Sequence, residues 1–108
     1  MKKIKLVTFV PVSHADAVRK AIGDVGGGIE GKYTHCSFST PGTGRFLPQS
    51  GASPAIGTVG KFEEVVEERI EVTCEEKDCK HIIVAIKSVH PYEEIPINIY
   101  PMLSIDEL

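Results

Sequence analysis

The sequence predicts an α+β fold in which an antiparallel sheet carries two helices on one face. Apolar residues alternate with polar ones in four segments, which is the period of strands, and recur at helical spacing in two others. The segments follow the order βαββαβ, which is the pattern of a ferredoxin-like sandwich. At 108 residues, the chain is expected to form a single domain over residues 1–108, with a small core that gains from a partner.

The first half of the pattern is a strand over residues 3–10 followed by a helix. Ser13 is expected to cap that helix, with Asp16 three residues later as a weaker variant of the capping box. An apolar stripe then runs along one helical face, and three glycines, Gly26–Gly28, end the helix. The stripe consists of Val18, Ala21, Ile22 and Val25.

A second strand is expected over residues 33–39 and a third over residues 67–74. Between them lies a long loop, about residues 40–61, that is rich in Gly, Pro, Ser and Thr. A structureless loop of this length is uncommon in a compact domain and often has a function. We therefore expect this loop to be the first place to look for a ligand.

The second helix is expected over residues 79–89, because Pro91 disfavours helical geometry in the residue before it. A short fourth strand over residues 95–100 contains Pro96, which suits the edge of a sheet. Together these elements complete the predicted sandwich.

The alternation divides the strand residues between two faces. The set expected to face the helices is Ile4, Leu6, Val10, Cys36, Phe38, Ile70, Val72, Ile97 and Ile99. The opposite face presents apolar Val7, Phe9, Tyr33 and Tyr100 among Lys5, His35, Ser37, Arg69, Glu71, Thr73 and Asn98. Apolar patches with polar rims usually mark interfaces, so we expect a homo-oligomer.

Composition narrows the classes of partner and compartment. The net charge is −3, and the twelve Lys and Arg are scattered, so nucleic acid is not expected as a partner. No apolar run approaches the length of a membrane span, so no membrane partner is expected. Three cysteines, Cys36, Cys74 and Cys79, fit no disulfide framework, which predicts reduced thiols in a cytoplasmic protein.

Five motifs occur in register along the chain and carry a family resemblance. They are Gly31-Lys-Tyr-Thr-His-Cys-Ser-Phe, Gly42-Thr-Gly-Arg-Phe-Leu-Pro, Pro54-Ala-Ile-Gly-Thr-Val-Gly-Lys-Phe-Glu, Glu68-Arg-Ile-Glu and His90-Pro-Tyr-Glu-Glu. In these motifs the chain resembles the domain inserted in NGG-interacting-factor-three-like (Nif-three-like) proteins. The resemblance implies a stand-alone version of that insert, with the fold of PII signalling proteins and CutA and their trimeric assembly. It does not bring the two-metal site of the family's flanking domain, because the histidines of this chain lack a matching context.

The turn after the second helix is a candidate site. His90, Glu93 and Glu94 lie close together in sequence, and an imidazole beside carboxylates is a possible divalent-metal site or proton-sensitive switch. The plainer interpretation is a helix stop with a polar cap, and we favour it because a metal needs three or four ligands. Cys36 or His35 on the second strand would be the candidate third ligand.

Two further clusters are weighed in the same way. Gly42, Gly44 and Arg45 have the makings of an anion-binding loop, although glycine turn chemistry explains the same residues without a ligand. Cys74 and Cys79 with His81 resemble a soft-metal trio, but inward cysteines usually pack as small apolar groups. No residue is predicted to be catalytic.

The leading hypothesis is a non-catalytic, oligomeric binding or regulatory module, with a trimer favoured over a dimer. Its ligand would be a small molecule, a metal or a partner protein. The residues expected at the ligand site are Cys36, Gly42, Gly44, Arg45, His90 and Tyr92. The alternative is a metal-binding protein or metal-dependent enzyme that uses the turn from His90 to Glu94.

Overall fold

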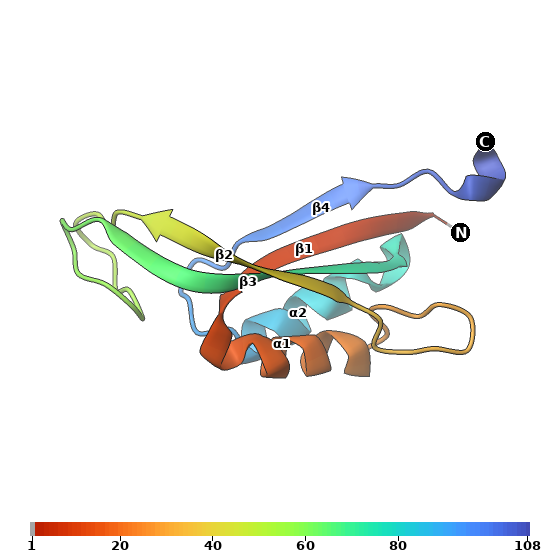
Figure 1. The fold of residues 1–108 in the computed structure, drawn as a ribbon, viewed down its shortest axis with the longest axis horizontal. Coiled ribbons are helices and arrows are strands. Elements are labelled where there is room, and N and C mark those ends of the chain that lie inside the picture. Colours follow the sequence, from red (N-terminus) through yellow and green to blue (C-terminus); the bar gives the residue numbers. More distant parts are fainter. Residues whose placement is uncertain (1) are drawn as a thin grey trace.

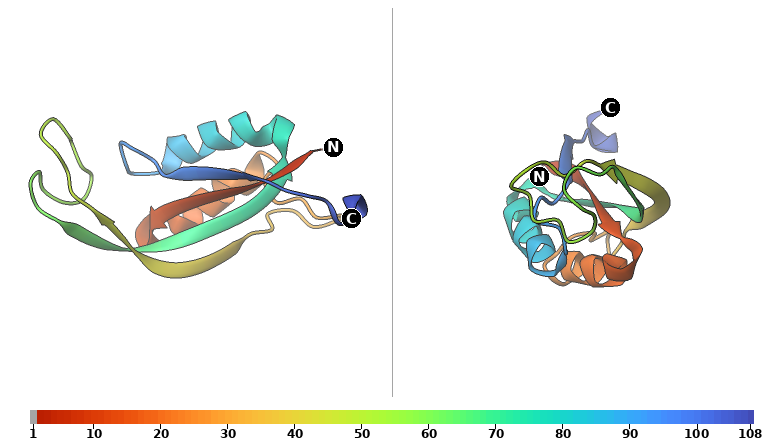
Figure 2. Two further views of the ribbon diagram at one scale, coloured as in Figure 1. Left: turned by 90° about the horizontal axis from the view of Figure 1, so that it is seen from above. Right: turned by 90° about the vertical axis from the view of Figure 1, so that its left-hand side faces the viewer.

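The computed structural model describes residues 2–108 and contains the elements in the predicted order (Figure 1). They are β1 (Lys3–Pro11), α1 (Val12–Asp24), β2 (Phe38–Phe46), β3 (Glu63–Glu75), α2 (Cys79–Val89) and β4 (Ile97–Pro101), with short 3-10 turns at Glu76–Asp78 and Ile105–Glu107. The sheet order is β2-β3-β1-β4, and each neighbouring pair is antiparallel. Figure 2 shows both helices on one face of the sheet, which confirms the ferredoxin-like class.

The core lies between the sheet and the two helices. Leu6 of β1 and Ile70 of β3 are wholly buried there, together with Ile22 of α1 and Ile82 of α2. Each such side chain contributes about 1.5 to 3 kcal/mol relative to an exposed one. The periodicity of these four elements therefore reports the true core. No helix among residues 2–108 is both long and apolar enough to cross a membrane.

Three residues predicted for this core lie outside it. Phe38 is 66% exposed because it pairs with Glu71 and so lies on the face away from the helices. Ile99 lies opposite Leu6 on the helix face, and it is 44% exposed because β4 is an edge strand. Cys36 is only partly buried and precedes β2. The apolar face of an edge strand is covered from one side only.

The second strand and the loop after it have different bounds from those predicted. Residues 40–46, expected in the loop, continue β2 and pair with Glu63–Arg69 of β3, so the loop covers residues 47–62. Tyr33, expected in the strand, instead closes a tight turn with Glu30. Pro41 and the glycines are tolerated because β2 is an edge strand, bonded to β3 alone.

The start of α1 also differs from prediction. The helix begins at Val12 directly after Pro11, without a side-chain cap among the described residues. Ser13 lies inside the first turn and bonds the ring of His14, and Asp16 pairs with Arg19. Gly26, at φ 101°, follows the end of α1 as expected, because this geometry favours glycine. The end of α2 before His90 is confirmed.

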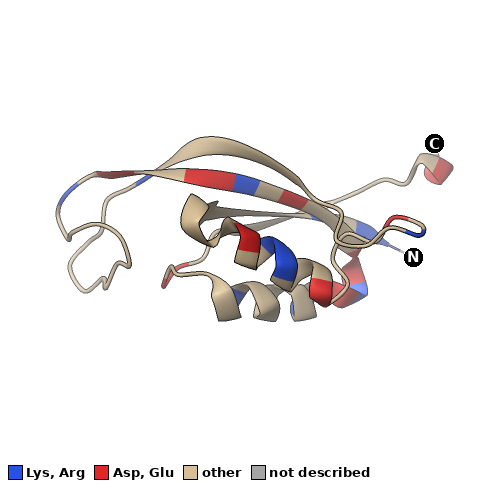
Figure 3. Cartoon of the chain, turned by 60° about the horizontal axis from the view of Figure 1, so that its bottom comes forward, with Lys and Arg blue, Asp and Glu red and all other residues tan. Residues whose placement is uncertain are grey.

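On the face without helices, two apolar side chains are less exposed than the alternation predicted. Val7 is 0% exposed and Phe9 is partly buried. Val7 lies on the central strand β1, opposite Glu71 of β3 and Asn98 of β4, so longer neighbouring side chains cover it. The prediction that Val7 forms part of an exposed patch is therefore wrong. Figure 3 shows acidic and basic residues intermixed along the helices and strands.

Candidate functional site

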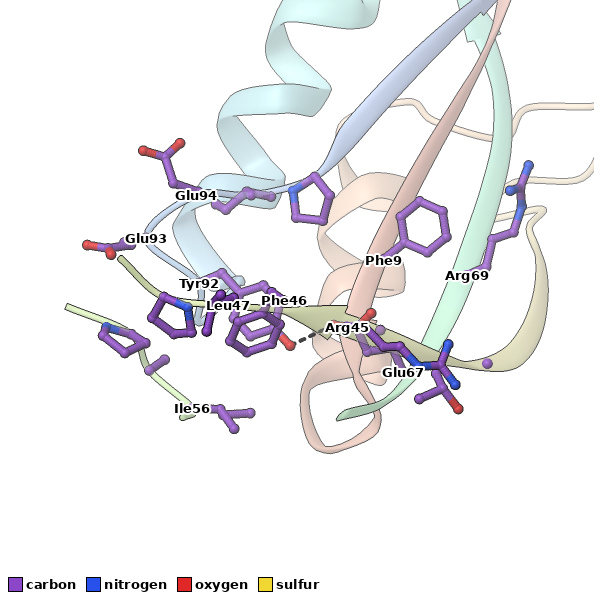
Figure 4. Close-up of a pocket in the computed structure, with 18 of the residues that line it drawn as sticks. Phe9, Arg45, Phe46, Leu47, Ile56, Glu67, Arg69, Tyr92, Glu93 and Glu94 are labelled. Atoms are coloured by element: carbon purple, nitrogen blue, oxygen red, sulfur yellow. Dashed lines mark hydrogen bonds between the residues drawn. The ribbon is translucent and has the colours of Figure 1, made fainter. Parts of the chain in front are cut away.

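An open cavity of about 780 Å³ lies at the end of the sheet where β2 runs into the 47–62 loop (Figure 4). Residues of β1, β2 and β3 on the face away from the helices form its floor, and the 92–96 segment between α2 and β4 closes one side. Its apolar lining consists of Phe9, Phe46, Leu47, Ile56, Tyr92 and Ile95, with prolines at 41, 48, 54 and 96. The molecule is elongated, with extents of 49 × 26 × 23 Å, which leaves this end of the sheet beyond the helices.

Glu67 supplies a carboxylate to the cavity floor. Its side chain is 7% exposed, and its Oε2 accepts a hydrogen bond of 2.6 Å from the hydroxyl of Tyr92. Burial, together with the hydrogen bond to this carboxylate, raises the pKa of Tyr92 above its usual value, so the phenol keeps the proton that it donates. The pair joins β3 to the segment after α2.

Gly44 makes room for this carboxylate. A Cβ at Gly44 would overlap Glu67 Oε1, whereas a Cβ at Gly42 would meet nothing within 4 Å. Both glycines are extended in β2, and neither has a positive φ. Gly42 and Gly44 are therefore not turn residues, and anion binding by this segment stays a prediction. Because Gly44 has no side chain, the carboxylate of Glu67 can lie directly against β2 at this position.

Two arginines line the cavity, and both already have partners outside its lining. Arg45 Nε lies 3.2 Å from Glu64 Oε1, and Arg69 Nε lies 3.0 Å from Glu71 Oε2. Arg69 also stacks over the ring of Phe9, with its guanidinium carbon 5.7 Å from the ring centroid. Arg45 therefore lines the cavity, and its charge is shared with an exposed carboxylate.

The 47–62 loop is connected to the 92–96 segment across the cavity. The backbone N–H of Ser53 donates a 2.8 Å hydrogen bond to Glu93 Oε1. The rings of Phe46 and Tyr92 meet edge to face, with centroids 6.1 Å apart. Through these contacts, segments far apart in sequence enclose one space.

His90 completes the sheet rather than facing the cavity. Strand β4 pairs with β1 only as far as Thr8, and His90 Nε2 then donates a 2.7 Å hydrogen bond to the carbonyl of Phe9. Nδ1 accepts from the backbone N–H of Tyr92 at 3.2 Å, so both ring nitrogens are engaged and the tautomer is fixed. Burial lowers the pKa of His90, which favours the neutral ring.

The predicted metal ligands are not gathered into a site. Among residues 2–108, no group of three or more His, Cys, Asp or Glu side chains is placed to hold a metal ion. Glu93 and Glu94 line the cavity, but the ring of His90 is turned to backbone groups. The helix stops before His90 as predicted, but the imidazole bonds backbone groups of Phe9 and Tyr92 rather than the end of α2.

Of the residues predicted to bind a ligand, Gly42, Gly44, Arg45 and Tyr92 line one cavity. Cys36 does not, because it lies in the segment before β2, at the other end of the sheet (Figure 1). Cys74 and Cys79 are buried in the core as expected, and burial raises the pKa of Cys74 to about 11. Their candidate partner, His81, is exposed on α2.

Four important lining residues were not predicted for the site: Phe9, Phe46, Glu67 and Arg69. Glu67 stands among Glu63, Glu64, Glu68 and Glu71, a local sequence that is typical of a solvated strand edge. The signal that was available is the alternation, because it places Glu67 and Arg69 on the face that also carries Phe9.

Comparison with known proteins links this fold and sequence to two groups. The chain is 43% identical over 99 residues to the GTP cyclohydrolase 1 type 2 homolog of Mycobacterium tuberculosis and 44% identical over 98 residues to that of Bacillus subtilis. These alignments cover 92% and 91% of this chain but 26% of each relative, so the chain spans about a quarter of their length. No protein-family model matches the chain.

Solved structures give the same result. A Bacillus cereus protein related to NIF3 superposes with a TM-score of 0.84 at 44% identity, covering 95% of this chain and 26% of that one. The periplasmic divalent cation tolerance protein CutA of Archaeoglobus fulgidus superposes with a TM-score of 0.70 at 15% identity, covering 94% and 85%. In sequence and fold, this chain therefore matches a segment of about a quarter of the length of proteins related to NIF3, and it has the fold of CutA.

Proposed function

We propose that this chain is a non-catalytic binding module that takes a small organic molecule into the cavity between β2, the 47–62 loop and the 92–96 segment. The observation that carries the proposal is the cavity of about 780 Å³, with mainly apolar walls and a few fixed polar groups. Concave sites of this size and lining are typical of small-molecule binding. The resemblance to one segment of longer proteins fits a module that works beside another domain.

The regulatory part of the proposal follows from how the cavity is enclosed. The 47–62 loop contacts the rest of the molecule through the hydrogen bond from Ser53 to Glu93. A ligand seated beneath the loop would change the balance between loop positions, since it binds one of them better than the others. Ligand binding would thereby alter the surface that the module presents to a partner protein.

Protein-observed ¹⁵N NMR with a library of small organic fragments tests the proposal. We expect binding fragments to shift the amide signals of Gly44, Phe46 and Tyr92. The variant Ala52→Trp, which adds volume at a partly buried lining residue, should weaken these fragments. Ser50→Trp, in the same loop but exposed and outside the lining, should not.

Two results would contradict a ligand site here. One is a set of shifts that gathers at residues 27–37, at the other end of the sheet. The other is fragment binding that Ala52→Trp and Ser50→Trp change to the same extent.

We also propose that the chain self-associates, with three-fold closure as the resemblance to PII and CutA implies. The support is now the β4 edge and the segment after it, where Tyr100, Leu103, Ile105 and Leu108 are 48 to 91% exposed. Sedimentation equilibrium at micromolar concentration should give a mass of more than one chain, and Leu103→Asp should lower it. A mass of one chain for the parent protein would refute self-association and leave the cavity proposal intact.

A further inference from the structure

The charges that line the cavity do not cancel. The lining includes three glutamates, Glu67 and the exposed Glu93 and Glu94, and two arginines, Arg45 and Arg69. Each arginine is already paired with a carboxylate outside the lining, whereas the lining carboxylates have no cationic partner among the described residues. The cavity is therefore short of positive charge.

Glu67 is the lining carboxylate that has a free acceptor oxygen. The residue is 7% exposed, and the hydroxyl of Tyr92 bonds only Oε2. Oε1 lies beside Gly44 and accepts no hydrogen bond from a described residue, and it still reaches solvent, because no buried side-chain oxygen among the described residues lacks a partner. A carboxylate has about four acceptor positions, so Oε1 can accept from a ligand in the cavity. A ligand with a charged N–H would make a charge-assisted hydrogen bond there.

The walls favour the same kind of ligand. Phe9, Phe46 and Tyr92 contribute aromatic rings to the lining, and Figure 4 shows the hydroxyl of Tyr92 directed at the carboxylate of Glu67. The ring of Phe46 packs against that of Tyr92. Aromatic faces attract cations, as the stacking of Arg69 over Phe9 at 5.7 Å already shows in this molecule. An anionic ligand would meet arginines that are neutralised and carboxylates that are not.

We propose that the cavity binds an organic cation, a primary ammonium or amidinium on an aromatic or apolar body, with its N–H groups on Glu67 Oε1. The inference rests on the proposed binding function and names the ligand class for it. Glu67 provides the charge-assisted hydrogen bond, Tyr92 holds the carboxylate in place, and Gly44 leaves the space that the carboxylate occupies.

Three indoles of similar size and different charge test this assignment: tryptamine, tryptophol and indole-3-acetate. We expect tryptamine to bind about tenfold or more tightly than neutral tryptophol, because it adds a charge-assisted hydrogen bond to Glu67. Indole-3-acetate should bind most weakly. The titration follows the amide signals of Gly44 and Tyr92 by NMR.

Glu67→Gln keeps an acceptor for Tyr92 and removes the charge, so it should abolish the preference for tryptamine over tryptophol. Glu75→Gln makes the same change in net charge at the far end of β3 and should leave the preference unchanged. Should Glu67→Gln fail to fold, the comparison of the three indoles on the unaltered chain still decides the question.

Equal binding of tryptamine and tryptophol at the cavity, or a preference that survives Glu67→Gln, would overturn the cation assignment while supporting the binding function. Absence of binding by all three indoles would also overturn the assignment. The fragment experiment with Ala52→Trp then decides the binding function separately.

Discussion

The two faces of this sheet are built from alternate residues of the same strands, and one packs the core while the other lines the cavity. On β1, Leu6 faces the helices and is wholly buried, while Phe9 faces the cavity. On β3, Ile70 packs in the core, while Glu67 and Arg69 line the cavity. The helix face is filled with apolar side chains and the open face leaves a space with polar groups at its floor. Substitutions at neighbouring positions should therefore separate stability from binding.

The largest effect is expected in the core. Leu6→Ala should lower the free energy of unfolding by about 2 to 5 kcal/mol, because it removes a wholly buried side chain and leaves a cavity. Urea unfolding measures the loss. Val84→Ala, at a side chain 68% exposed on α2, is the matched control and should change stability by less than about 0.5 kcal/mol. Equal losses from the two variants would refute the packing described for the helix face.

A smaller loss is expected on the open face from Tyr92→Phe. The variant removes the only donor to Glu67 Oε2 among the described residues, and an unsatisfied buried acceptor costs about 1 to 3 kcal/mol. Tyr33→Phe, at a side chain 75% exposed, serves as the control in the same urea experiment. If Tyr92→Phe is as stable as the control, the pair with Glu67 is not formed in solution.

Two glycines of β2, Gly42 and Gly44, provide a sharper test of where the carboxylate of Glu67 lies in the cavity. Gly44→Ala should cost about 1 to 2 kcal/mol and weaken ligand binding, because the added methyl overlaps the buried carboxylate of Glu67. Gly42→Ala meets open space and should be neutral or stabilise by about 0.4 to 1 kcal/mol, since it restricts the unfolded chain. Thermal unfolding of the two variants in parallel compares them. The reverse order of stability would place the carboxylate elsewhere.

The smallest effect concerns the pH dependence contributed by His90. Its pKa is lowered in the folded state, chiefly by burial, so the unfolded chain binds the proton more readily. The stability linked to this group is present above the unfolded pKa of about 6.5 and is lost as the pH falls below it. Urea unfolding between pH 7.5 and 5 should show this loss, and His90→Gln should reduce it. An unchanged pH dependence in His90→Gln would contradict the buried, neutral ring.

The fold could be predicted where the apolar residues of a single segment repeat with the period of a helix or a strand. The stripes of α1 and α2 and the alternation of β1 and β3 located the core, because burial against a neighbour selects these patterns. Strand β2 could not be bounded in this way. Residues 40–46 lack an alternating apolar pattern, and their extended form is defined by pairing with β3, a contact distant in sequence.

The sequence indicated part of the cavity lining but not the contacts within it. The motifs around Gly42 and His90 do meet near one cavity. The role of Gly44 depends on a carboxylate 23 positions along the chain in Glu67, which reads locally as a solvated acidic residue. The role of His90 depends on the carbonyl of Phe9, left without a strand partner where β4 stops. Neither relation is visible until the strands are paired.

The central claim is that the open face of the sheet holds a small-molecule site, and NOEs between bound tryptamine and the ¹³C-labelled chain test it most directly. The account predicts contacts from the indole ring to the side chains of Phe46, Ile56 and Tyr92, which enclose the cavity. Contacts confined to residues 27–37 or to the segment after β4, with none from those three side chains, would contradict it.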